Sequence, residues 1–274
     1  MNMAVTPSCN MGRLEDARSA WFVRGAAAAP VRIGLGALIE LLGGGGAADA
    51  GDDGEVFSIQ RVPRGTTLVH EGAHAQALYV VQAGSFKCVK TGEDGYENVL
   101  SFAWRRDVIG YDGLHRDRYA FAAVALEDSR VVVLPMAGLA ALRQRSPVLD
   151  AALQRLIARQ LAHAGEIAEV MSAVAADARL ARFLGQLSVR MAECGQSPRR
   201  LLLRMNRRDI ANHLGLAHET ISRSFRLLSD SGCLRVDDRD VEILDLQGLR
   251  RCARSTRGAP YDDVAPRMEL ARAA

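Results

Sequence analysis

The sequence has no long apolar run and no export signal. No stretch of the 274 residues approaches the ~20 apolar residues that a membrane-spanning helix requires. The first residues lack the charged-then-apolar pattern and the cleavage site of a signal peptide. We therefore expect a cytoplasmic protein with no membrane partner.

Cysteine and lysine are also scarce. The five cysteines stand at positions 9, 88, 194, 233 and 252, and none of them forms a Cys-x-x-Cys pair. This odd count and wide spacing argue against a disulfide framework and against a zinc or iron–sulfur site of the contiguous type. Lys87 and Lys90 are the only lysines, so arginine carries nearly all of the positive charge.

What is present indicates a globular chain of two domains between low-complexity ends. Hydrophobic residues make up 49% and charged residues 24%, and the length is sufficient for two cores. Residues 1–54, rich in alanine and glycine, predict a disordered leader, with a short helix over Val31–Leu42 against the next domain. Residues 251–274 predict a flexible tail.

Residues 55–135 predict an all-β domain. Short runs of β-forming residues are separated by glycines at regular spacing, which is typical of a sandwich or roll. Asp94-Gly95 is a hairpin-turn signal. The predicted strands are Val56–Ile59, Thr66–Val69, Leu78–Val81, Phe86–Val89, Val99–Phe102, Phe121–Leu126 and Arg130–Leu134.

Residues 136–175 predict a short hinge helix and then a long helix that begins at Pro147. Apolar side chains recur along the long helix at alternating four- and three-residue steps, as in a coiled-coil seam. Part of this stripe must pack on the chain's own β-domain, but its breadth leaves a face for a second copy. We expect a homodimer interface of Leu149, Leu153, Leu156, Ile157, Leu161, Ala164, Ile167, Ala168 and Met171.

Residues 176–250 predict a helix-turn-helix unit. After a helix over Ala176–Glu193, the segment Arg207–Arg223 has apolar residues at the inward positions of two short helices. Ala211 is small where the helices must approach closely, and Gly215 permits the turn between them. The strands Leu234–Val236 and Val241–Leu246 predict a wing, whose acidic turn suits packing rather than phosphate binding.

The charges of this unit fit a nucleic-acid surface or a solvated helix surface, and the helix-turn-helix spacing decides for binding to double-stranded DNA. Residues 199–226 contain seven arginines against Asp209 and Glu219, a basic surface of the kind that contacts nucleic acid. Early residues of the second helix reach base edges in the major groove, and here these are His218, Glu219, Ser222 and Arg223. The alternative for Glu219 and Arg223 is a surface ion pair. Expected phosphate contacts are Asn206, Arg207, Arg208, Thr220 and Arg226.

With these residues in view, the chain resembles the Crp/Fnr regulators over about residues 55–250. In the most similar passage, Met205–Leu234, the run Glu219-Thr220-Ile221-Ser222-Arg223 matches the Glu-x-x-Ser-Arg motif of the Fnr branch. The resemblance implies an α+β fold with a cyclic-nucleotide-binding-like β-roll, a dimerisation helix and a C-terminal winged helix-turn-helix. It also implies a homodimer on a TTGAT inverted repeat, with Arg223 on the guanine, and a contact with RNA polymerase through a loop such as Gly92–Gly95.

Two departures from the family bear on cofactors. Oxygen-sensing Fnr proteins hold an iron–sulfur cluster with closely spaced N-terminal cysteines and one in the β-roll, whereas here the leader has Cys9 alone and the β-roll position is Val132. The cAMP branch holds the cyclic phosphate with Gly-Glu and Arg-Ser pairs, which are Gly110-Tyr111 and Tyr119-Ala120 here. We expect no iron–sulfur cluster, no cAMP binding and no required cofactor.

Other functions remain open at this point. A haem-gated regulator is one alternative, with His70, His74, His115 or His163 as haem ligands. A cAMP-gated regulator is another, and it would need a nucleotide pocket without the family's phosphate-binding pairs. Oxidation of Cys194, just before the DNA-binding unit, is a further hypothesis, against burial as an inert thiol. A cupin-like metalloenzyme would rest on His70-x-x-x-His74 alone, a spacing that does not place both rings on one metal in a strand and turn. We expect neither enzymatic activity nor a metal site.

Overall fold

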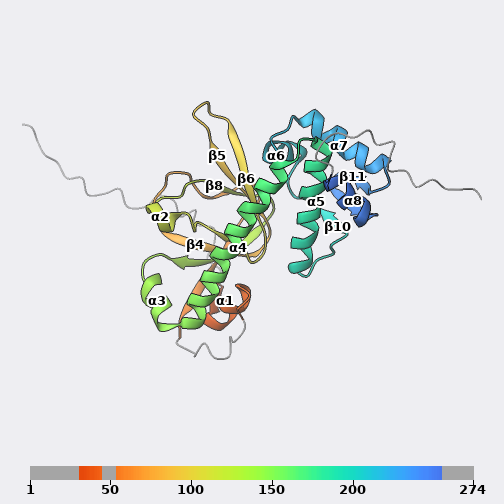
Figure 1. The fold of residues 1–274 in the computed structure, drawn as a ribbon. Helices are drawn as coiled ribbons and strands as arrows, with labels where there is room; N and C mark the ends of the chain where they lie inside the picture. Colours follow the sequence, from red (N-terminus) through yellow and green to blue (C-terminus); the bar gives the residue numbers. More distant parts are fainter. Residues whose placement is uncertain (1–30, 45–53, 255–274) are drawn as a thin grey trace, which may run out of the picture. The chain divides into compact units, whose positions relative to one another are not determined.

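The computed structural model describes residues 31–44 and 54–254, and Figure 1 labels its helices and several of its strands. The rest of the predicted leader, with Cys9, and residues 255–274 of the predicted tail lie outside the described residues. Within the described part, the short helix predicted over Val31–Leu42 is confirmed, whereas the predicted leader and tail each include residues that belong to the folded chain. Strand β1 (Arg32–Gly34) pairs with the β-domain, helix α1 (Leu35–Leu41) buries four side chains in its core, and helix α8 (Leu246–Arg254) extends past residue 250.

The β-domain consists of two sheets packed face to face. One has the strand order β1-β2-β9-β4-β7 and the other β3-β8-β5-β6. All seven predicted strands are confirmed, while β7 and the short helix α2 (Gly113–Arg116) were not predicted. The strands are β2 (Val56–Val62), β3 (Thr67–Val69), β4 (Ala77–Ala83), β5 (Phe86–Thr91), β6 (Glu97–Ala103), β7 (Val108–Ile109), β8 (Ala122–Ala125) and β9 (Ser129–Pro135).

Alternation of side chains along the strands builds the core of this domain. Successive residues of a strand point to opposite faces, so every second apolar residue reaches the space between the sheets. Val81, Phe86 and Val131 are fully buried there. The outer face of the β4–β9 pair is covered instead by α1 and by the start of the long helix, through Leu78, Val132 and their neighbours.

The long helix α4 (Pro147–Ser172) follows the hinge helix α3 (Leu139–Arg145), as the sequence predicts. The hydroxyl of Ser146 accepts a hydrogen bond from the backbone N–H of Leu149 at 3.3 Å, and Pro147 occupies the first helical position, where its missing N–H is harmless. None of the helices in residues 31–44 and 54–254 is long and apolar enough to cross a bilayer.

The C-terminal unit is a winged helix-turn-helix. Helix α5 packs against α7 and α8, and a sheet of order β10-β12-β11 forms the wing (Figure 1). Strand β10 was not predicted, because only Leu201 of its three side chains turns inward. The remaining elements are α5 (Ala176–Glu193), β10 (Arg200–Leu202), α6 (Arg207–His213), α7 (His218–Asp230), β11 (Leu234–Asp237) and β12 (Asp240–Ile243).

Candidate nucleic-acid interface

Helices α6 and α7 form the predicted helix-turn-helix. Asn206 begins α6 with a capping box: its side-chain oxygen accepts from the N–H of Asp209 at 2.7 Å, and the Asp209 carboxylate accepts from the N–H of Asn206 at 3.1 Å. The turn to α7 places Gly215 at φ +62°, a conformation that costs glycine little. The side chains that hold the two helices together are fully buried; they are Ile210, Ala211, Leu214 and Ile221.

The four predicted base-reading residues lie together on the first two turns of α7. His218, Glu219, Ser222 and Arg223 are all exposed. The Ser222 hydroxyl donates to the backbone oxygen of His218 at 3.1 Å, so it is oriented along the helix. Glu219 and Arg223 form no ion pair in the part of the chain that the structure describes, so the alternative of a mutual surface pair is not observed. Both charged groups are available to a ligand.

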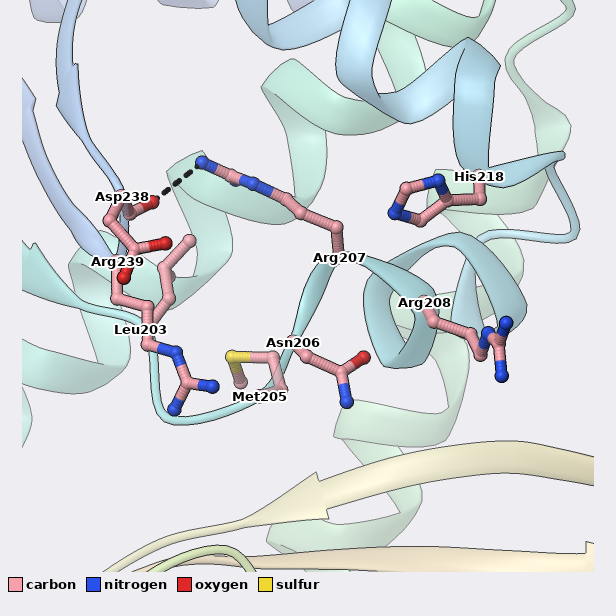
Figure 2. A pocket seen from close by; sticks show the side chains of 8 residues that line it. All are labelled: Leu203, Met205, Asn206, Arg207, Arg208, His218, Asp238 and Arg239. Atoms are coloured by element: carbon pink, nitrogen blue, oxygen red, sulfur yellow. Dashed lines mark hydrogen bonds between the residues drawn. The ribbon is translucent and has the colours of Figure 1, made fainter.

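The guanidinium of Arg207, a predicted phosphate contact, is engaged by contacts within the C-terminal unit. It lies 3.4 Å from the ring centroid of Phe225. The same group donates to the backbone oxygen of Asp238 at 2.9 Å, as Figure 2 shows. The Nη1 atom is buried without a partner, and burial lowers the pKa of the group. Arg207 therefore fastens the wing turn to α7, because Asp238 belongs to the wing and Phe225 to α7.

The other predicted phosphate contacts remain accessible to different degrees. Arg208 and Arg226 are exposed, and Thr220 is half-buried on α7. Asn206 is also exposed, but its side-chain oxygen serves the capping box, so its amide group is the donor left for a phosphate.

A recess of about 410 Å³ adds a residue that the sequence reasoning missed. Figure 2 shows Arg239 of the wing turn and Arg208 and His218 of the helices around this space. In the sequence, the acidic residues on both sides of Arg239 made the wing turn look unsuited to phosphate. In the structure, Arg200 pairs with Asp240 at 2.8 Å, so the charge of one of these acidic residues is neutralised. The recess is lined by Leu203, Met205, Asn206, Arg207, Arg208, His218, Asp238 and Arg239.

The predicted dimer seam on α4 divides into two parts. Leu149, Leu153 and Leu156 are buried in the core with α1 and the β-domain, so the prediction that they face a partner is wrong for these three. Further along, Leu161 is 76% exposed and Ile157 43% exposed. The accessible stripe consists of Ile157, Leu161, Ala164, Ala168 and Met171, while Ile167 is half-buried beside a cavity.

Comparison with known proteins agrees with this architecture. Residues 178–252 match the Crp-like helix-turn-helix domain, and residues 59–146 match the cyclic nucleotide-binding domain. The transcriptional regulatory protein btr of Bordetella pertussis is 34% identical over 191 residues, which cover 70% of this chain and 79% of that protein. The chain belongs to the Crp/Fnr family of transcription regulators. Its helix-turn-helix domain implies DNA binding.

Two further comparisons agree with membership of this family. The fumarate and nitrate reduction regulatory protein of Escherichia coli is 33% identical over 196 residues, covering 72% of this chain and 78% of that one. The structure of FixK2 from Bradyrhizobium japonicum is similar with a TM-score of 0.64 and 25% identity, covering 72% of this chain and 98% of that one.

The stretch that corresponds to the nucleotide pocket is held by contacts within this regulator. Gly110 has φ +91°, and a Cβ there would lie 2.8 Å from the ring of Tyr119. The Tyr119 hydroxyl donates to the backbone oxygen of Ala77 at 2.8 Å, and the carboxylate of Asp112 accepts from the N–H of Ala120. The N–H of Ala120 is thus already paired. The absence of cAMP binding remains a prediction.

The histidines named as haem ligands lie in different surroundings. His163 is half-buried and lines a cavity of about 200 Å³, with its Nδ1 3.3 Å from Nη2 of Arg190. Burial and the positive charge of Arg190 lower the pKa of His163. His70, His74 and His115 are exposed. Among residues 31–44 and 54–254, no group of three or more His, Cys, Asp or Glu side chains is placed to hold a metal ion.

The thiols of Cys88 and Cys194 favour their protonated form. Burial raises the pKa of Cys88 to about 12 and also raises the pKa of Cys194. The half-buried Cys194 thiol donates to the backbone oxygen of Arg105 at 3.4 Å. Because the thiolate is the reactive species, this environment disfavours Cys194 as a redox sensor.

Proposed function

We propose that this regulator binds a TTGAT-type inverted repeat as a homodimer, with Arg223 reading the guanine. The observation that carries the proposal is the exposed Glu-x-x-Ser-Arg motif at the start of α7, beside a basic recess and free of internal ion pairs. A helix-turn-helix reads DNA with this part of its second helix.

The chemistry of the motif suits a G·C pair in the major groove. An arginine fork donates to O6 and N7 of guanine, and a carboxylate accepts from N4 of cytosine. Glu219 and Arg223 are four residues apart on α7, so both project from one face of the helix. A correct contact of this kind contributes ~1–3 kcal/mol of discrimination against a wrong base pair.

Phosphate contacts would then fix the position of α7 in the groove. Arg208 and Arg226 are exposed for this role, and Arg239 of the wing joins them across the recess. Thr220 and the amide of Asn206 are weaker, neutral donors. Such contacts supply affinity without sequence preference.

The accessible stripe on α4 is the surface proposed for dimerisation. A continuous stripe of apolar side chains as exposed as Leu161 is unfavourable in water when the protein is a monomer. Burying this apolar area against a second copy would stabilise the dimer. A two-fold dimer presents two reading helices, and an inverted repeat with half-sites about one helical turn apart has the same symmetry.

The proposal also includes two further points: the DNA-bound regulator contacts RNA polymerase, and it binds DNA without a cofactor. The turn Gly92–Gly95 lies at the end of the β5–β6 hairpin with residues 93–95 exposed, and it is a candidate polymerase contact. A ligand-gated regulator is the alternative, and the cavity beside His163 is the observation that favours it.

The experiment is selection of binding sites from a random duplex library by the purified protein without added ligand. We expect enrichment of TTGAT and ATCAA half-sites in inverted order. Arg223→Ala should lose the preference at the guanine, whereas Arg226→Ala, a matched loss of one exposed charge, should weaken binding without changing the preference. If the wild type selects an unrelated consensus, or if Arg223→Ala selects the same consensus as the wild type, the assignment of Arg223 to the guanine is rejected.

A further inference from the structure

Two side chains of α6 form hydrogen bonds with the backbone of β6, the edge strand of its sheet. β6 is the last strand of its sheet, and such an edge exposes backbone groups that need partners. The N–H of Val99 donates to Oδ1 of Asn212 at 2.5 Å, and Nδ2 of Asn212 donates to the oxygen of Glu97 at 2.7 Å. The oxygen of Val99 lies 3.2 Å from Nδ1 of His213. Both backbone groups of Val99 are therefore satisfied by the end of α6.

A buried charge pair fastens the other end of the same helix. Nζ of Lys87, on β5, lies 2.9 Å from Oδ1 of Asp209, and the two side chains are 21% and 10% exposed. Asp209 is also the capping-box carboxylate of α6. The ring centroids of Phe102 and His213 are 5.0 Å apart. Val89 and Val99 of the β-domain also share one apolar core with residues of α5, α6 and α7.

This β6–α6 contact leaves the reading surface uncovered. His218, Glu219, Ser222 and Arg223 are exposed, and none has a hydrogen bond or ion pair to residues 54–135 in the described structure. Because α6 and α7 share a buried interface, holding α6 also fixes the direction of α7. A contact that blocked DNA would instead cover these side chains.

We propose that Lys87 and Asn212 are positioning residues for DNA binding: they dock α6 on the β-domain and so hold each reading helix in the orientation that a dimer needs. The inference rests on the proposed function, since orientation matters when two half-sites are bound at once. Neither residue touches DNA; both act through α6.

The effect follows from the fraction of docked units. An affinity falls in proportion to the population of the competent state. If loss of the Lys87 ion pair reduces docking to about a third in each subunit, about a tenth of dimers have both units in place, and affinity for the full repeat falls about tenfold. A single half-site needs one unit and no fixed spacing, so its affinity should stay within about twofold.

Docking itself is measured by hydrogen exchange of the Val99 amide in the full-length protein. We expect slow exchange in the wild type and at least about tenfold faster exchange in Asn212→Ala, because this N–H then faces water. Lys90→Met is the matched control for Lys87→Met, since Lys90 is the exposed lysine three residues along the same strand. Lys87→Met should speed exchange at Val99, and Lys90→Met should not.

The functional arm compares Lys87→Met and Lys90→Met on a full TTGAT inverted repeat and on a duplex with one half-site. The proposal is supported if Lys87→Met loses affinity for the full repeat but not for the single half-site, and if Lys90→Met loses affinity for neither. Equal loss on both duplexes would mean that the substitution damages the helix-turn-helix itself, and tighter binding would mean that docking opposes DNA binding; either result overturns the inference. Wild-type protein without preference for the repeat would reject the proposed function instead, and exchange at Val99 would then decide the docking alone.

Discussion

Arg190 joins α5 to the turn before β7 through a buried ion pair. Its Nη2 lies 2.6 Å from Oδ2 of Asp107, and the side chains are 18% and 6% exposed. The guanidinium also stacks 4.6 Å from the ring centroid of Trp104, whose backbone N–H donates to the same carboxylate oxygen at 2.9 Å. We predict that Arg190→Met destabilises the protein strongly, because it leaves the Asp107 carboxylate buried beside one neutral donor.

The expected size follows from this burial. Breaking a buried pair by removing one partner costs about 3–5 kcal/mol, and the residual exposure of Arg190 favours the lower end. A loss of ~3 kcal/mol corresponds to a fall in Tm of roughly 6–12 °C for a chain of this size. Asp107→Asn should cost less, because Arg190 can turn toward water and the amide oxygen still accepts from Trp104. The double variant should recover at least ~1 kcal/mol relative to the sum of the single variants.

The assay is urea unfolding followed by tryptophan emission. Trp21 and Trp104 are the two tryptophans, so a Trp21→Phe background makes Trp104 the reporter of the contact. Arg155→Met, which removes an exposed arginine of α4, is the control and should change stability by less than ~0.5 kcal/mol. A cost below ~1 kcal/mol for Arg190→Met, or strict additivity in the double variant, would refute the reasoning.

Three further predictions concern the turn, the dimer and pH. Gly215→Ala should lower the free energy of unfolding by ~1–2 kcal/mol, since φ is +62° there, whereas Gly185→Ala, in the open face of α5, should not; equal effects in thermal melts would contradict this. Leu161→Glu should weaken dimerisation by roughly 100-fold in sedimentation experiments, because each subunit would bring a carboxylate into the proposed apolar interface; an unchanged dimer would place the interface elsewhere. Burial lowers the pKa of His213, so the unfolded chain binds a proton first as pH falls below about 6.5, and stability that is present above that pH is lost as the pH falls further. His213→Phe should flatten this decline in Tm, and an identical pH profile would exclude His213 as its source.

The parts of the fold with strong local patterns could be predicted from the sequence. The period-two strands of residues 56–134 and the apolar, small and glycine positions of α6 and α7 each depend on neighbours in the chain. Strands β1, β7 and β10 were missed because they are two or three residues long and exist through pairing with distant strands.

The site was predicted where exposure follows from helix geometry, and not where it depends on tertiary contacts. The reading residues of α7 lie on its solvent face, as expected. An apolar stripe does not reveal what covers it, so Leu149, Leu153 and Leu156 were assigned to a partner although the β-domain covers them. Charge likewise does not distinguish a phosphate contact from an internal one: Arg207 stacks on Phe225 inside the unit, while Arg239 lines the recess.

The most direct test of the account is a thermodynamic cycle between Arg223 and the guanine of the half-site. Dissociation constants of the wild type and of Arg223→Ala would be measured at one salt concentration, on a TTGAT–spacer–ATCAA duplex and on the same duplex with both guanines replaced. We predict that the wild type loses at least about tenfold in affinity per replaced guanine, and that Arg223→Ala binds both duplexes equally. If Arg223→Ala still discriminates between them, another residue reads the guanine and the central claim is wrong.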